Sequence, residues 1–161
     1  MSSLLSIDPG IRGCGAALFV DKQLVRADYI KSFVKTGNQA AEARAMAQAV
    51  SGWLSTHPAH IVVEWPRIYR NVRGKDPNDL LALCAVNAAI AALYPYAVVD
   101  SYFPAEWKGQ QKKEICHRRI VKILGEAEAK ILTDAAARAK SLSHNMMDAV
   151  GIGLFALGRF T

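Results

Sequence analysis

Three acidic residues stand beside apolar runs that are far apart in the sequence. Asp8 and Glu64 each end a short apolar run, and Asp148 lies near the start of an apolar, glycine-containing run. A carboxylate at the edge of an apolar core pays a desolvation penalty unless a cation or several hydrogen-bond donors compensate it. Carboxylate oxygens are the ligands that hard divalent cations prefer, and two such ions about 4 Å apart can promote phosphodiester hydrolysis. The three acids therefore predict convergence on a shared cation site.

Two of these acids also have an ordinary structural explanation. Asp8 could form an Asx-turn with Pro9 and Gly10, which is a common use of Asp before a turn. Glu64 could pair with Arg67, three residues later. Because neither explanation accounts for three acids beside apolar runs, we favour the metal site.

Composition limits the possible partners and the compartment. The chain has 161 residues, of which 52% are hydrophobic, and this is enough for one domain with its own core. A net charge of +6 and a pI near 9.4 favour polyanionic partners. Three scattered cysteines give no disulfide or zinc pattern, and Asp8 interrupts the first apolar run, so we expect no signal peptide and a reducing, cytoplasmic location. The stretch from Leu80 to Val99 is broken by Pro95 and is expected to form a buried helix and a buried strand, not a membrane span.

Periodicity and turn signals predict the order of the elements. Strands are expected at about residues 4–8, 13–20, 23–30, 60–64 and 96–101, and helices at about 39–56, 79–93, 112–124, 126–140 and 145–158. Asp79 is the expected cap of the second helix, Gly151 and Gly153 should let the last helix pack closely on the sheet, and most aromatic side chains should lie in the core. This order predicts an α/β fold in one domain, residues 1–161. Its five-stranded mixed sheet should begin with an antiparallel three-stranded meander and continue with strands that alternate with helices.

The order of elements and acids resembles the ribonuclease H-like superfamily, and more narrowly the RuvC family of Holliday-junction resolvases. The residues that carry the resemblance are Ile7-Asp8-Pro9-Gly10 with Gly13, Val62-Val63-Glu64, Asp148-Ala149 before an apolar helix, and the proline and lysines of segment 104–113. The resemblance covers nearly the whole chain. It implies a ribonuclease H-like α/β fold and an endonuclease that cuts branched DNA by metal-assisted hydrolysis.

The resemblance also implies a ligand set and an assembly. Asp8 would bridge two ions, Mg²⁺ or Mn²⁺, while Glu64 and Asp148 would hold one ion each. Enzymes of this family act as homodimers, because a four-way junction presents two equivalent strands to a two-fold enzyme. The Ala-rich helix expected at 79–93 is the candidate interface.

Basic residues form two segments that are expected to contact DNA. The first segment, residues 66–75, follows Glu64 closely and contains no acidic residue before Lys75. We therefore favour contact with DNA phosphates over a merely solvated loop. Within it, Tyr69 could stack on an unpaired base or pack in the ordinary way. In the second, the resemblance implies that Lys108 and either Lys112 or Lys113 lie near the scissile phosphate. The candidate DNA-binding residues are Arg67, Tyr69, Arg70, Arg73, Lys75, Lys112, Lys113, Arg118 and Arg119.

The fourth group of the site has several candidates. The family usually carries an acid or a histidine three residues before the final aspartate, where this chain has Asn145, with His144 beside it. On a helix both residues flank Asp148, so each could reach the site. His144 could act as a general acid or base, or Ser143, His144 and Asn145 could form an N-cap network. Asp100, at the end of the fifth strand, is a rival ligand, although an Asp that opens a loop is more often a cap or turn residue.

Two other functions are weighed against a DNA junction nuclease. The same fold supports nucleases that act on RNA or on RNA–DNA hybrids. A catalytically silent junction-binding protein is the third possibility. The three acids argue against a silent protein, whereas the missing acid or histidine at Asn145 argues for it, and we expect a metal-dependent endonuclease.

Overall fold

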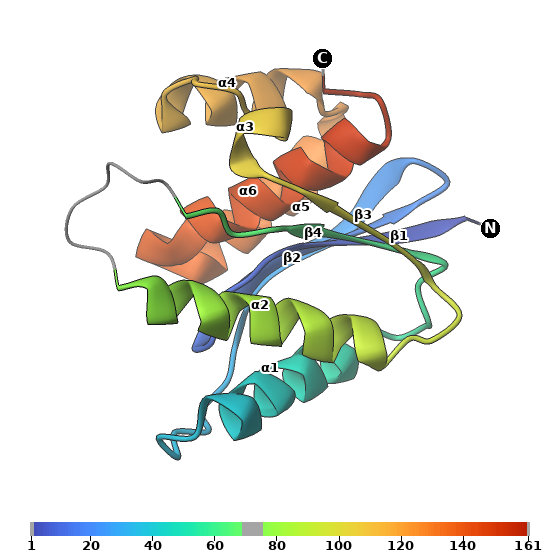
Figure 1. Ribbon diagram of the computed structural model, residues 1–161. Helices are drawn as coiled ribbons and strands as arrows, with labels where there is room; N and C mark the ends of the chain where they lie inside the picture. The colour runs from blue at the N-terminus through green and yellow to red at the C-terminus, as the bar shows by residue number, and fades with distance from the viewer. Residues whose placement is uncertain (1, 69–75, 161) are drawn as a thin grey trace.

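The sheet brings together strands from both halves of the chain. In the computed structural model, which describes residues 2–68 and 76–160, five strands lie in the order β3-β2-β1-β4-β5 (Figure 1). The strands are β1 (Ser3–Asp8), β2 (Gly13–Val20), β3 (Gln23–Lys31), β4 (His60–Glu64) and β5 (Val98–Tyr102). β1, β2 and β3 form the predicted antiparallel meander, whereas β4 is parallel to β1 and β5 is parallel to β4. The predicted five-stranded mixed sheet is thereby confirmed.

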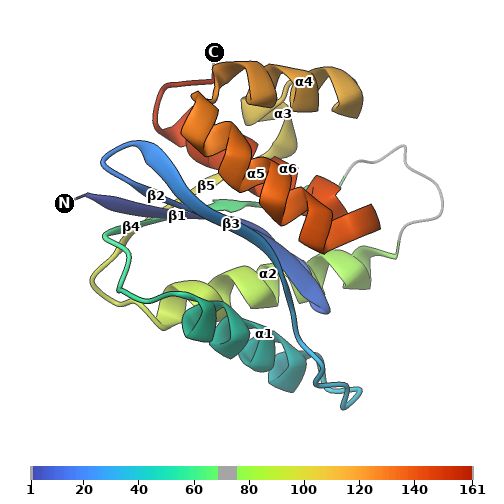
Figure 2. The same ribbon diagram turned by 180° about the vertical axis from the view of Figure 1, so that it is seen from behind.

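Helices cover both faces of this sheet, as Figures 1 and 2 show. They are α1 (Gln39–Trp53), α2 (Pro77–Ala92), α3 (Pro104–Trp107), α4 (Lys113–Ile123), α5 (Glu126–Ala139) and α6 (Ser143–Ala156), with a 3₁₀ turn, η1 (Lys140–Leu142), before α6. α1 and α2 pack together on one face, α5 and α6 lie on the other, and α4 packs on α6. The buried side chains accordingly form two clusters, one on each face. None of the helices in the described ranges is long and apolar enough to cross a membrane.

The alternation of side chains along β1 fixes the position of α6. Leu5 points into the cluster under α1 and α2, whereas Ser6 points toward α6. A buried hydroxyl needs a partner, and the Ser6 hydroxyl donates to the carbonyl of Ala149 at 2.7 Å. At Gly153 an added Cβ would overlap Phe19 and crowd Ser6. The missing side chain therefore lets α6 approach the sheet closely, as predicted.

Four elements differ from the sequence prediction. The N-cap of α2 is Asp76 and not Asp79, because Pro77 is well suited to the first helical position. β5 is not buried: it is an edge strand, and its Val98 is 62% exposed. The short elements α3 and η1 were outside the prediction, since three or four residues are too few to show periodicity.

The prediction that the aromatic residues pack in the core is wrong for several of those in the described ranges, of which Phe33 and Tyr96 are the most exposed. Phe33 is 90% exposed and lies in the connection between β3 and α1. Tyr96 is 99% exposed and lies between α2 and β5. Both residues stand in connections, where the periodicity that marks a buried face gives no information.

A buried ion pair joins α5 to the segment that follows α6. Arg159 donates two hydrogen bonds to the carboxylate of Glu128, both at 2.7 Å. The backbone N–H groups of Leu24 and Gly125 donate to the same carboxylate. The hydrogen bonds from Arg159 are the main reason that the pKa of Glu128 falls from 4.5 to about 2. Glu128 therefore connects β3, α5 and the C-terminal segment.

Glu128→Gln is expected to lower the free energy of unfolding at pH 7 by about 3 kcal/mol, because it leaves Arg159 without its charged partner. A carboxylate with a lowered folded-state pKa stabilises the protein above its unfolded pKa. The difference between wild type and variant should therefore shrink as the pH falls from 4.5 toward 2. Urea unfolding at pH 7 and pH 3 measures both effects. Glu126→Gln, in the exposed first turn of the same helix, is the matched control, and an equal loss in both variants would contradict the role given to the ion pair.

Candidate active site

The three acids from separate parts of the sequence lie at one edge of the sheet. Asp8 ends β1 and Glu64 ends β4, and these two strands are parallel neighbours. Asp148 lies in the second turn of α6, which packs on β1 and β2 (Figure 1). At Gly15, the strand partner of Asp8, an added Cβ would overlap the backbone of Asn145. The start of α6 can therefore lie against the strand that pairs with Asp8.

The ammonium group of Lys108 lies between two of the carboxylates. Its Nζ is 3.3 Å from Oε2 of Glu64 and 3.4 Å from Oδ2 of Asp148. Lys108 follows the short helix α3, whose Glu106 carboxylate accepts a hydrogen bond from the backbone N–H of Phe103 at 2.6 Å. This bond closes the first turn of α3. The helix thus positions Lys108 over the ends of the strands.

Two further side chains contact the acids and were missed by the sequence reasoning. The indole N–H of Trp107 donates to Oε2 of Glu64 at 2.8 Å. Nε2 of His117, on α4, lies 3.0 Å from Oδ1 of Asp148. Helical spacing could have identified this histidine, because it lies three residues before the buried Ile120 and so shares the face that packs on α6.

The acids and the lysine are electrostatically coupled. The pKa of Asp8 is raised well above its ordinary value, mainly by burial and then by the charges of Glu64 and Asp148. Burial also raises the pKa of Asp148, but the hydrogen bond with His117 and the charge of Lys108 outweigh burial and leave this pKa lowered. Burial lowers the pKa of Lys108, whereas the carboxylates raise it, and the net result is a raised pKa. Lys108 is therefore a cation among acids, and the raised pKa of Asp8 means that this carboxyl resists ionisation.

The donor set of this site suits a hard divalent cation. The repulsion that raises the pKa of Asp8 is a repulsion between carboxylates, and a bound cation would relieve it. As the side chains stand, no three Asp, Glu, His or Cys residues within 2–68 and 76–160 form a group that could hold a metal ion. The ammonium of Lys108 instead lies between Glu64 and Asp148 and contacts both carboxylates. Binding a cation would therefore require Lys108 to move away from at least one carboxylate.

The candidates for the fourth group have other contacts. Nδ1 of His144 is 3.2 Å from the carbonyl oxygen of Ser141. The side chain of Asn145 interacts with the phenol of Tyr29, whose pKa is raised mainly by burial. The predicted N-cap network is not formed, because the cap of α6 is Leu142, which makes no side-chain hydrogen bond. The roles proposed for His144 and Asn145 in catalysis stay predictions.

Asp100 lies apart from the three acids. It is inside β5, and its carboxylate is 2.8 Å from Nε2 of His60. His60 begins β4, whereas Glu64 ends it, so this contact lies toward the other end of the strand. The idea that Asp100 ends a strand beside the site is wrong, because β5 continues to Tyr102.

Of the two lysines near the start of α4, Lys113 is the one whose charge acts on two of the acids. Its charge lowers the pKa of both Asp8 and Asp148. Lys112 is exposed at the N-cap of the same helix. This electrostatic effect favours Lys113 as the second lysine of the site, whereas Lys112 remains a candidate for DNA contact outside the site.

The remaining basic candidates divide between those that pack on aromatic rings and those that face solvent. The guanidinium of Arg67 lies 5.3 Å from the ring centroid of Phe103, and that of Arg119 lies 4.9 Å from the ring centroid of Phe160. Arg118 is exposed on α4. Four candidates lie outside the described residues: Tyr69, Arg70, Arg73 and Lys75.

Comparison with models of known protein families and with curated protein sequences found no match. Solved structures do match. RuvC of T. thermophilus in complex with a Holliday junction substrate is 21% identical, with a TM-score of 0.64, and the match covers 99% of this chain and 98% of that chain. A second Thermus thermophilus RuvC structure is 18% identical, with a TM-score of 0.61, over 98% and 97% of the two chains. Ydc2, the yeast mitochondrial Holliday junction resolvase, is 15% identical, with a TM-score of 0.61, over 94% of this chain and 76% of that chain.

These likenesses extend over almost the whole chain and include the sheet and the helices on both of its faces. They show that the chain has the fold of RuvC and Ydc2. The predicted ribonuclease H-like α/β class is confirmed.

Proposed function

We propose that the protein is a structure-selective endonuclease that cuts Holliday junctions and related branched DNA. The observation that carries the proposal is the meeting of Asp8, Glu64 and Asp148 at one sheet edge, with Lys108 among them, in a fold shared with a RuvC that binds a Holliday junction. Converging carboxylates are the ligands that metal-assisted phosphodiester hydrolysis uses, and a lysine among them can stabilise charge on the phosphate.

Each residue of the site has a definite task in this proposal. Asp8 would bridge two Mg²⁺ or Mn²⁺ ions, while Glu64 and Asp148 would hold one each. When bound, such ions stabilise charge on the phosphate and lower the pKa of water. Trp107 orients Glu64 through its indole N–H, and Lys108 carries a positive charge to the place where the scissile phosphate must lie.

In this proposal His117 orients Asp148. Substitutions of His117, His144 and Asn145 distinguish this role from the roles predicted for the other two residues. His117→Ala should lower the cleavage rate by about 10- to 100-fold, the usual loss when a partner of a metal ligand is removed. His144→Ala should have a smaller effect, since His144 contacts the Ser141 carbonyl. Asn145→Asp should retain or raise activity, because it adds a carboxylate near Asp8. Single-turnover cleavage rates measure all three variants, and a large loss in His144→Ala with none in His117→Ala would reverse the assignment.

A homodimer is part of the proposal. A four-way junction offers two equivalent strands, and a two-fold enzyme can cut both. α2 buries Ala82, Val86 and Ile90 against the protein but leaves Leu81 61% exposed, so its outer face can receive a second copy. Sedimentation of wild type and of Leu81→Arg measures whether this face makes the dimer.

One experiment separates the proposal from its alternatives. The protein is incubated with a labelled four-way junction, duplex, flap and RNA–DNA hybrid, each with Mg²⁺, Mn²⁺ or EDTA. Cleavage of the junction with either metal, and none in EDTA, is expected. Preferred cleavage of the hybrid would favour a ribonuclease, and junction binding without cleavage under any condition would favour a silent binding protein.

A further inference from the structure

The connection between β3 and α1, residues 32–38, lies at the same edge of the sheet as Asp8. In the β1–β2 pair Asp8 is opposite Gly15, and in the β2–β3 pair Gly13 is opposite Lys31, the last residue of β3. The chain therefore leaves β3 at the same end of the sheet as the carboxyl end of β1, with β2 between the two strands. Figures 1 and 2 both show this connection, the 32–38 loop, at the same end of the sheet as the turn between β1 and β2.

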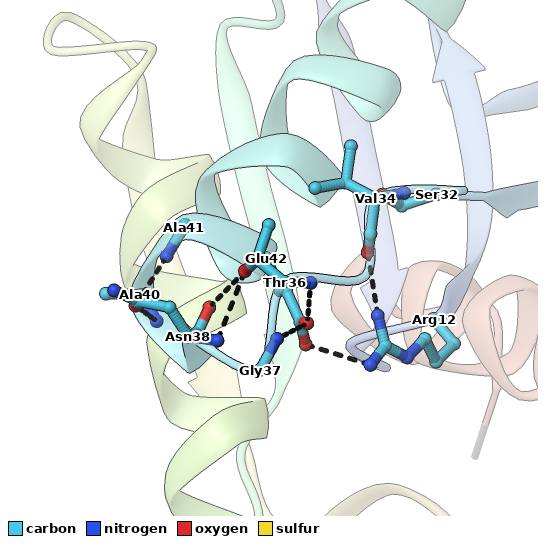
Figure 3. A network of polar contacts seen from close by, with 9 residues as sticks. All are labelled: Arg12, Ser32, Val34, Thr36, Gly37, Asn38, Ala40, Ala41 and Glu42. Atoms are coloured by element: carbon cyan, nitrogen blue, oxygen red, sulfur yellow. Dashed lines mark hydrogen bonds and ion pairs between the residues drawn. The ribbon is translucent and has the colours of Figure 1, made fainter.

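A network of polar contacts holds the 32–38 loop in place (Figure 3). Oε1 of Glu42 accepts hydrogen bonds from the backbone N–H groups of Thr36 at 2.7 Å and Gly37 at 2.9 Å. Nη1 of Arg12 donates to the carbonyl of Val34 at 2.7 Å, and its Nη2 lies 3.1 Å from Oε2 of Glu42. Both oxygens of this buried carboxylate are thus engaged. The loop is anchored at three successive points along its backbone.

Arg12 connects the 32–38 loop to the turn that follows Asp8. It stands four residues after Asp8, and its backbone carbonyl accepts a hydrogen bond from the N–H of Ser32 at 3.2 Å. Its guanidinium extends from that turn to Val34 and Glu42. The position of the loop is therefore set relative to the acids as well as relative to α1.

Phe33 is 90% exposed within this anchored loop. A single exposed apolar side chain is ordinary by itself. Ordering a backbone segment costs conformational entropy, however, and the core gains nothing from a phenyl ring that faces solvent. Lys31 and Lys35, both exposed, stand on either side of Phe33 in the sequence. An aromatic face between two cationic side chains suits a nucleic acid strand, whose bases stack and whose phosphates are anionic.

We propose that Phe33 stacks on an unpaired base of the DNA strand that enters the active site, and that the Arg12–Glu42 pair holds Phe33 at a fixed position relative to Asp8. This inference rests on the proposed function, because it takes branched DNA as the ligand. At a branch point the helical stack is interrupted, so a base there can unpair at lower cost than inside a duplex. An anchored platform adds affinity because no loop has to be ordered on binding. Lys31 and Lys35 contact the phosphates on either side of the stacked base.

A double-mutant cycle between Phe33 and the bases of a four-way junction tests this inference. Abasic sites are placed one at a time at the positions that flank the crossover, and affinity is measured in EDTA so that no strand is cut. In the wild type, one abasic position should weaken binding by about tenfold, as the loss of a base–aromatic stack does. In Phe33→Ala the intact junction should bind about tenfold more weakly, and the same abasic site should have no further effect. Phe33→Trp should restore both the affinity and the sensitivity to that site.

Tyr96→Ala is the matched control for Phe33→Ala. Tyr96 is 99% exposed, but it precedes β5 and so lies toward the edge of the sheet where β4 and β5 begin. Removal of the Tyr96 side chain should leave unchanged both the affinity for the intact junction and the effect of each abasic site on affinity. Arg12→Met tests whether the Arg12–Glu42 pair positions Phe33. This substitution should reduce the coupling energy between Phe33 and the base, although Phe33 itself is intact.

Three results would overturn the inference. Additive effects of Phe33→Ala and every abasic site, in a protein that binds and cuts the junction, would reject the stacking role and leave the proposed function standing. Failure of the wild type to bind any branched DNA would reject both. Dissociation of a wild-type dimer by Phe33→Ala, with no such effect of Tyr96→Ala, would assign Phe33 to a contact between two copies.

Discussion

Asp8→Asn is expected to lower the rate of junction cleavage by about a thousandfold or more, while junction affinity changes by less than about threefold. The substitution removes the charge that would bridge two cations, and such cations supply several kcal/mol of charge stabilisation in the transition state. Each 1.4 kcal/mol corresponds to about a tenfold change in rate. Affinity is spared because a carboxylate repels phosphate and contributes no favourable contact to the backbone of DNA.

Single-turnover cleavage and gel-shift binding of a labelled junction measure the two quantities. Glu64→Gln and Asp148→Asn should lose comparable activity, and the triple variant should be little worse than any single one, because residues that act as a unit are not additive. Full activity of Asp8→Asn would contradict the assignment.

The stability of Asp8→Asn shows whether lost activity reflects unfolding. The raised pKa of Asp8 means that its ionised form destabilises the cation-free fold as the pH rises above the unfolded-state pKa. At pH 7 the variant should therefore be at least as stable as the wild type in EDTA. Added Mn²⁺ should raise the Tm of the wild type and leave that of the variant unchanged.

Lys108→Met is expected to lower the cleavage rate by about 100-fold, the usual loss when one donor to a developing negative charge is removed. Lys108 contacts Glu64 and Asp148; in the proposed function, cations that displace it from a carboxylate would leave its charge beside the scissile phosphate. Affinity should fall much less than the rate, because one phosphate contact is a small part of binding. Rate and affinity are measured on the same junction.

Lys112→Met is the matched control for this variant. Lys112 is exposed, so its loss should weaken binding and reduce the slope of log K against log salt by about 0.9, while the rate at saturating protein is retained. Equal effects of the two substitutions on rate would contradict the distinction between a lysine at the acids and a lysine farther out.

The convergence of the three acids could be predicted from the sequence, because each acid stands where a local sequence pattern changes. Asp8 and Glu64 end apolar runs that are short enough to be strands, and the order of the elements then makes those runs neighbours. Asp148 is marked by the small residues around it, and Gly153 does allow the close approach of α6 to the sheet. Pattern and topology together were therefore sufficient for the position of these acids.

Other parts of the site depend on tertiary packing that local pattern does not record. Trp107 and His117 reach Glu64 and Asp148 only because α3 and α4 fold over the strand ends. His144 stands four residues before Asp148 in the sequence, yet its side chain contacts the backbone carbonyl of Ser141 and not the acids. The exposure of β5 follows from its place at the edge of the sheet, which strand composition alone does not reveal.

Titration of Mn²⁺ into the protein, with the free ion followed by electron paramagnetic resonance, tests most directly whether the three acids form a divalent-cation centre. This measurement does not depend on the choice of DNA substrate. Saturable binding by the wild type is expected, with two ions per chain at saturation and its loss in Asp8→Asn. Absence of saturable binding by the wild type, or equal binding by Asp8→Asn, would contradict the metal site at Asp8, Glu64 and Asp148.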